Sequence, residues 1–164
     1  MFDLKPLTLE AVPRALEKAE RYRLLNEPGE AESICEDVLQ IDPQNQQAIV
    51  TLLLALTEQY DDGLGGHLAH AHEVLLRLSD EYELAYYSGI VAEREGKARL
   101  RAGGPGATMS AGDCLREAMQ FFERAEALRS PGNDDAVLRW NACARLLRRL
   151  PQPVAGEHFL PLLE

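Results

Sequence analysis

PRALEKAERYRLLNEPGEAESICEDVLQIDP, residues 13–43, contains two short helical patterns separated by a single break. On both sides of Pro28-Gly29, apolar residues recur every three or four positions, as they do on one face of an α-helix. Pro28-Gly29 interrupts the first helix. Asp42-Pro43 ends the second, because a residue before proline avoids the helical conformation. The stretch predicts a helical hairpin, with residues 14–25 packed on residues 30–41.

Five further runs with helical spacing follow, and they cover residues 45–60, 67–78, 80–102, 111–128 and 134–150. The run 45–60 is apolar on most sides, which predicts a helix in the middle of the molecule. Residues 61–66 and 103–110 are rich in glycine and are expected to be loops. Ser79 is expected to cap the helix that starts near Asp80. No stretch has the period of two that a half-buried strand requires, so we expect an all-α protein of seven antiparallel helices.

The first two runs resemble a tetratricopeptide repeat (TPR). The residues that carry the resemblance are Ala15, Lys18, Ala19, Tyr22, Ala31, Cys35 and Pro43. In this register small Ala19 lies against small Ala31, Tyr22 wedges between the helices, and Pro43 turns the chain into the next unit. Two degenerate units follow, with turns that are six and 17 residues longer. The last helix, which contains Trp140, is similar to the family's capping helix.

The resemblance implies a fold in which helical hairpins stack as a short right-handed superhelix over residues 13–150. An extended arm, residues 1–12, would precede it, and an apolar tail, residues 151–164, would follow. Members of the family bind a peptide or protein in a concave groove lined by the first helix of each hairpin. Carried over in this register, the groove residues are Leu16, Glu20, Arg23, Val50, Leu54, Thr57, Tyr86, Ile90 and Glu93. The alternative, above all for Val50 and Leu54, is burial by neighbouring helices.

The charge of the chain indicates which class of partner to expect. The formal net charge is −10 and the pI about 4.9, which disfavours nucleic acid because phosphates need a basic surface. Residues 1–64 carry 13 acids and 5 bases, so we expect a basic or amphipathic protein or peptide. The alternative is that the acidity serves solubility. Leu16 and Glu20 stand where some family members use Lys and Asn to clamp a partner's terminal carboxylate, so that mode of binding is not expected.

Catalytic motifs are missing from the sequence, which has no serine elbow, no GxGxxG after a strand and no HExxH. We therefore expect a binding protein without a cofactor and not an enzyme. The weak candidates for a metal site are His67 and His70, which would share a helix face, while His72 would point away. A third ligand would have to come from Asp61, Asp62 or Glu73. The alternative is a set of solvent-facing histidines at a helix start.

The cysteines and the apolar segments indicate where the protein works. Cys35, Cys114 and Cys143 lie in apolar helical runs and form no CxxC pair, which is typical of a reducing compartment. No signal-peptide pattern is present, and the longest apolar stretch, near residues 49–56, is too short to span a membrane. We expect a cytoplasmic protein without membrane contact, and the usage of Ala, Leu and Arg suggests a bacterial source.

The leading functional interpretation is a scaffold or adaptor that holds a protein or peptide. A small secretion-type chaperone, similar in length, acidity and helical build, is the alternative, and a metal-binding protein is a third. The tail 151–164 would either cover the last helix pair or fill the groove of a second molecule, which would give a homodimer. Loop 103–110 is interpreted as a flexible insertion between helices, and loops of this length often contact a partner or fold over a groove. A basic patch of Arg145, Arg148 and Arg149 is expected to interact with the dipole of its own helix, and the alternative is a phosphate-binding role.

Overall fold

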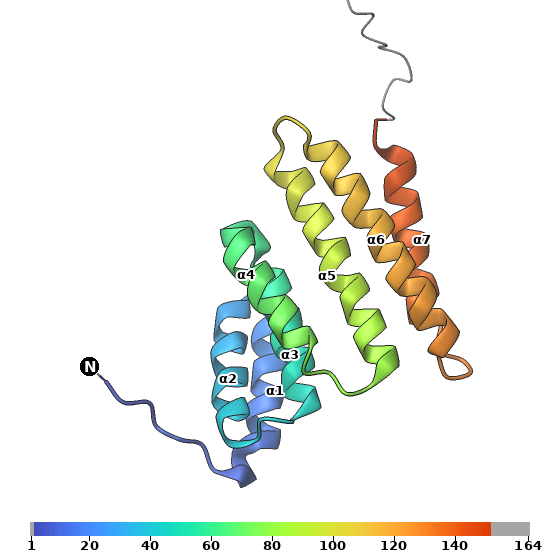
Figure 1. The fold of residues 1–164 in the computed structure, drawn as a ribbon. Coiled ribbons are helices and arrows are strands. Elements are labelled where there is room, and N and C mark those ends of the chain that lie inside the picture. The colour runs from blue at the N-terminus through green and yellow to red at the C-terminus, as the bar shows by residue number, and fades with distance from the viewer. Residues whose placement is uncertain (1, 152–164) are drawn as a thin grey trace, which may run out of the picture.

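The computed structural model describes residues 2–151, and over this range the chain is helical, with no strand (Figure 1). A short 3-10 turn, Leu9–Ala11, comes before seven α-helices. These are α1 Val12–Leu24, α2 Pro28–Ile41, α3 Gln46–Glu58, α4 Tyr60–Leu75, α5 Glu81–Ala102, α6 Ala107–Leu128 and α7 Asp135–Arg149. The expected all-α class and the seven helices are confirmed for this part of the chain.

The helices stack as three consecutive hairpins, α1–α2, α3–α4 and α5–α6, with α7 packed on α6 (Figure 1). Besides these sequential contacts, α1 contacts α3 and α3 contacts α5, so the first helices of the hairpins lie side by side. Helix α7 reaches α5 through Arg139, whose Nη1 lies 3.6 Å from Oε1 of Glu93. We call α1, α3, α5 and α7 the A layer, and α2, α4 and α6 the B layer.

Helix α3 lies in the middle, as its all-round apolar pattern predicts. Its side chains Ile49, Leu52, Leu53 and Leu56 are at most 1% exposed, and it contacts α1, α2, α4 and α5. Burying one such side chain contributes about 1.5–3 kcal/mol. Ala19 and Ala31 are fully buried in the same core cluster, so small residues lie where the first hairpin closes.

The expected arm of residues 1–12 is shorter in the structure, because α1 already begins at Val12 and follows directly on the 3-10 turn. Val12 is buried in the core of the first two hairpins, and Leu7 packs against that core. Pro13 occupies the first turn of α1, where the missing N–H of proline removes no hydrogen bond. The apolar contacts of Val12 and Leu7 therefore draw the end of the arm onto the domain.

The expected loop 61–66 is wrong, because the chain is already helical from Tyr60. Tyr60 is buried, and the Nη2 atom of Arg101 lies 2.9 Å from Oδ1 of Asp61. The helix continues past a kink at Gly63, whose backbone angles are not helical. Glycine has a low helix propensity, which is why the sequence predicts a loop here, but the chain is helical on both sides of the kink.

The expected loop 103–110 is also wrong in its extent, because only residues 103–106 lie outside helices. The long insertion between the third pair of helices lengthens α5 and α6 to 22 residues each. Gly103, Gly104 and Gly106 have φ values of 68°, 93° and 76°, a region that glycine enters without steric penalty. Glycine backbone freedom therefore lets the hairpin turn within four residues.

Capping differs from the prediction at one helix start. The cap of α5 is Asp80, whose side chain accepts a hydrogen bond from the backbone N–H of Glu83 at 2.8 Å. Ser79 instead donates its backbone N–H and its hydroxyl to Oε1 of Gln46, at 2.9 and 3.1 Å. Ser79 therefore ties the start of α5 to the start of α3.

The close packing of α5 on α6 depends on glycine at position 89. A Cβ atom placed there would lie 2.5 Å from Cε1 of Phe122, and the ring of Phe122 is fully buried. We expect Gly89→Ala to lower the free energy of unfolding by about 1–3 kcal/mol through overpacking, although alanine favours a helix by about 1 kcal/mol. Urea denaturation measures the change.

Gly112→Ala is the matched control on α6. Its Cβ would meet only the guanidinium end of Arg116, at 3.4 Å, so stability should stay the same or rise by up to about 1 kcal/mol. If both variants were equally stable, the contact between Gly89 and Phe122 would not limit the approach of the two helices.

Candidate functional site

The open side of α3 forms the centre of the candidate site. On this central helix Gln47 and Glu58 are exposed, and Val50 and Leu54 are half-buried. These positions lie three to four residues apart and therefore share one helix face. Charged side chains from α1 and α5 reach the end of this face at Glu58. The open face of α3 is therefore the floor of a surface that α1 and α5 flank.

A polar network joins α1 to α3 along this surface. Arg23 of α1 donates hydrogen bonds to both carboxylate oxygens of Glu58, at 3.0 and 2.6 Å, and to Glu20 at 2.9 Å. Glu20 also accepts the hydroxyl of Thr51 at 2.8 Å. Burial lowers the pKa of Arg23, but the bonds to Glu58 and Glu20 raise it by more, so the guanidinium stays charged.

The same carboxylate joins α3 to α5. Nη1 of Arg94 lies 3.5 Å from Oε1 of Glu58 and donates to the backbone oxygen of Leu54 at 3.2 Å and to the hydroxyl of Thr57. Burial lowers the pKa of Arg94, and the charge of Glu58 opposes this shift. Glu58 is therefore shared by two arginines and connects three helices of the A layer.

A second charged group joins α5 to α7. The carboxylate of Glu93 is fully buried and pairs through Oε1 with Lys97 on its own helix and with Arg139 on α7. Burial lowers the pKa of Arg139, while Tyr86 and Glu93 raise it by more. Both cations keep more than a third of their side-chain surface exposed. They therefore neutralise Glu93 from the solvent side of the A layer.

The residues predicted to line the groove divide into two sets. Four are buried, at 5% exposure or less, and present no surface to a partner: Leu16, Thr57, Ile90 and Glu93. Five are half-buried on the A layer: Glu20, Arg23, Val50, Leu54 and Tyr86. Leu16 and Ile90 belong to the two core clusters, because neighbouring helices cover these sides of α1 and α5.

Sequence reasoning missed the side chains that organise the surface. Glu58, Arg94, Lys97 and Arg139 form most of its ion pairs, yet none was singled out. Glu58 and Arg94 each follow directly on a residue that was. A charged residue next to a predicted groove residue was the available signal. The pairing itself was not, because Glu58 and Arg94 lie 36 residues apart along the chain.

Aromatic rings lie beside the second charged group. The ring of Tyr86 stacks on Tyr82 at 5.8 Å between centroids and packs against Phe122 at 5.9 Å. Tyr86 is half-buried, so part of its ring remains at the surface. This part of the A layer therefore combines an aromatic face with the cations Lys97 and Arg139.

The histidines are arranged differently from the prediction. The ligand atoms of His70, Glu32 and Glu36 lie within 4.8 Å of one another, whereas no such group within residues 2–151 contains His67, Asp61, Asp62 or Glu73. Glu32 already accepts a hydrogen bond from Gln59 at 2.6 Å. We assign no metal to this group, because a histidine beside two carboxylates is also an ordinary surface ion-pair arrangement.

The glycine-rich turn borders a small cleft at the far end of the molecule. Its volume is about 380 Å³, and its lining includes Met109 from α6, Leu147 from α7, and Leu150 and Pro151, which follow α7. The expectations for the tail concern residues that, Pro151 apart, lie outside the described part of the chain. Arg148 and Arg149 occupy the last turn of α7, where cations interact favourably with the helix dipole.

Comparison with known proteins found no matching family model, no matching curated protein and no matching solved structure. No helix within residues 2–151 is both long enough and apolar enough to cross a membrane.

The shared ion pairs make Arg94 important for stability. We expect Arg94→Ala to lower the free energy of unfolding by about 2–3 kcal/mol, because hydrogen bonds of a half-buried charged group contribute about 1.5–3 kcal/mol. Arg101→Ala, on the same helix, is the control: both side chains of its ion pair are more than half exposed, and such pairs contribute at most about 1 kcal/mol. Equal losses in urea denaturation would contradict a special role for Arg94.

Buried thiols and phenols make stability sensitive to alkali. Burial raises the pKa of Cys35, Cys143 and Tyr87 to about 12 and also raises that of Tyr60. In the unfolded chain these groups lose protons near their ordinary pKa values of about 8.5 for Cys and about 10 for Tyr. The folded state then binds more protons than the unfolded state, so the free energy of unfolding falls between about pH 8.5 and 12.

Urea denaturation midpoints across this range measure the fall. Between about pH 8.5 and 10 the cysteines carry most of it, so a Cys35→Ala, Cys143→Ala double variant should show a shallower dependence there. A midpoint that does not change up to pH 10 would contradict the expected burial of the two thiols.

Proposed function

We propose that this chain is a polypeptide-binding module and that its working surface is the A layer. The observation that carries the proposal is the open face of α3, where half-buried Val50 and Leu54 lie among charged side chains held in place by α1 and α5. Apolar anchors beside fixed polar groups are the chemistry of protein interfaces.

Rigidity of the surface supports the proposal. The guanidiniums of Arg23 and Arg94 are held by several bonds each, so little side-chain freedom is lost when a partner binds. A surface that is already ordered binds with a smaller entropic penalty than one that orders on contact. The A layer therefore suits a segment that docks onto a preformed surface.

The resemblance to TPR units supports the same proposal. In that family the first helices of successive hairpins line the binding groove, and here α1, α3 and α5 lie side by side in the corresponding order. A scaffold or adaptor of the cytoplasm is the role that fits such a surface. No feature of the described residues favours the secretion-chaperone or metal-binding alternatives over it.

Site-specific photocrosslinking tests the proposal without disturbing the fold. Benzoylphenylalanine replaces Gln47, an exposed residue of α3, or Glu73, an exposed residue of α4 in the B layer. In extracts of the native host we expect the probe at position 47 to capture a polypeptide and the probe at position 73 to capture much less. Equal capture at both positions, or capture only at position 73, would contradict the assignment of the A layer.

A further inference from the structure

The two helix layers carry opposite net charge. The B-layer helices α2, α4 and α6 contain 11 acids and 2 bases, and neither α2 nor α4 has any Lys or Arg. The A-layer helices contain 8 acids and 12 bases, of which α1 and α7 contribute four bases each. A protein with a net charge of −10 therefore has one basic helical layer.

The difference in charge between the two layers is larger at the surface, because several acids of the A layer are held in ion pairs within that layer. The side chains of Glu93 and Glu95 are 1% and 14% exposed, and each pairs with a base of its own layer. Six exposed bases of α1 and α7 form no ion pair with the described part of the chain; they are Arg14, Lys18, Arg21, Arg145, Arg148 and Arg149. The charges left for an external ligand on this layer are mainly positive.

Apolar surface lies among these bases. A cleft of about 490 Å³ along α1 is lined by Arg14, Glu17, Lys18, Arg21, Tyr22 and Leu25. Leu24 on α1 is 87% exposed and Leu138 on α7 is 64% exposed. A ligand seated on the A layer thus meets cations and isolated apolar side chains together.

We infer that the A layer takes an acidic polypeptide segment with apolar anchor residues. This inference rests on the proposed function and adds the chemistry of the partner. The partner's charge is opposite to that of the basic partner that the acidic N-terminal sequence predicts. The carboxylates of the segment pair with the exposed bases of α1 and α7, and its apolar residues contact the exposed Leu24 and Leu138 and the open face of α3.

The acidic B layer strengthens the selectivity of this arrangement. A basic segment would be drawn to α2 and α4, away from the A layer, while an acidic segment is repelled from them. Nucleic acid would suffer the same repulsion over a larger area, because its phosphates extend beyond one layer. The opposite charges of the two layers therefore orient an acidic segment as well as attract it.

Fluorescence anisotropy with the full chain tests the inference. The probe is a labelled synthetic peptide of repeating Leu-Leu-Glu-Glu, and its counterpart has Lys in place of every Glu. We expect the Glu peptide to bind at least about tenfold more tightly than the Lys peptide, and to weaken as NaCl is raised from about 50 to 300 mM, because salt screens exposed charges. Tighter binding of the Lys peptide, or binding of neither, would overturn the inference.

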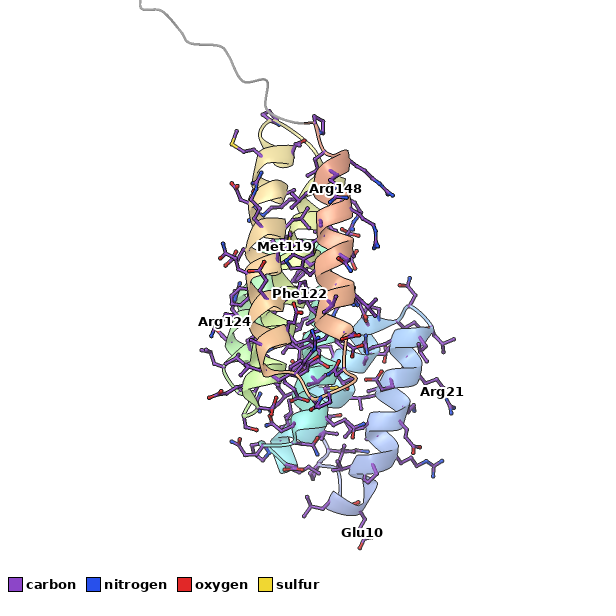
Figure 2. All side chains as sticks on the ribbon, turned by 90° about the vertical axis from the view of Figure 1, so that its right-hand side faces the viewer. Glu10, Arg21, Met119, Phe122, Arg124 and Arg148 are labelled. Atoms are coloured by element: carbon purple, nitrogen blue, oxygen red, sulfur yellow. The ribbon has the colours of Figure 1, made fainter. Side chains whose placement is uncertain are left out.

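Two matched charge reversals locate the binding surface. Figure 2 shows Arg21 of α1 and Arg124 of α6 projecting from opposite edges of the molecule. Arg14→Glu, Arg21→Glu on α1 and Arg116→Glu, Arg124→Glu on α6 change exposed residues and the net charge equally. We expect the α1 double variant to bind the Glu peptide at least about tenfold more weakly than the unchanged chain. The α6 double variant should bind it at most about threefold more weakly. Equal weakening would mean that net charge alone acts, which would overturn the inference.

Two further measurements exclude other occupants of the basic layer. A short DNA duplex that binds more tightly than the Glu peptide would replace the inference with nucleic-acid binding. Sedimentation velocity that shows a dimer, lost in the α1 double variant, would identify a second copy of this chain as the occupant and overturn the inference. Capture by the probe at position 47 combined with preference for the Lys peptide would leave the proposed function standing and reject only the acidic partner.

Discussion

The burial of α3 is the constraint on which the other helices depend. This helix is apolar on all but one side, and leaving its leucines and isoleucine in water would be unfavourable by roughly 1.5–3 kcal/mol each. Two helices cannot cover so wide an apolar surface, so α1, α2, α4 and α5 all pack on it. The side of α3 that stays open, with Gln47, Val50 and Leu54, thereby becomes the middle of the A layer.

The polar network at the edge of this core sets geometry more than it adds stability. A half-buried ion pair gains Coulomb energy but loses hydration, so its net contribution is small compared with the loss on removing one partner. Glu58 satisfies two arginines at once, so α1 and α5 cannot slide along α3 without leaving a charge unpaired. The same logic applies to Glu93, which connects α5 to α7.

Because the charges separate between the layers, the two sides of the molecule attract different ligands. Summed along the chain, acids dominate, and the first 64 residues look suited to a basic partner. When charges are summed by layer, the same residues separate by sign: α1 has a net positive charge, whereas every charged residue of α2 is acidic. Because the helices of a hairpin face opposite sides, electrostatic potential at a surface depends on which layer a charge belongs to.

Local sequence was sufficient to predict the number of helices, the central position of α3 and the burial of the small residues Ala19 and Ala31 in one core, because period, breakers and residue size act over a few positions. Local sequence was insufficient where contacts between residues far apart in the chain determine the structure. The chain around Gly65 and Gly66 is helical despite the low helix propensity of glycine, and four of the nine expected groove residues are buried by packing between helices. The pairing of Glu58 with Arg23 and Arg94, and with it the surface proposed to bind a partner, exists only once three helices stand side by side.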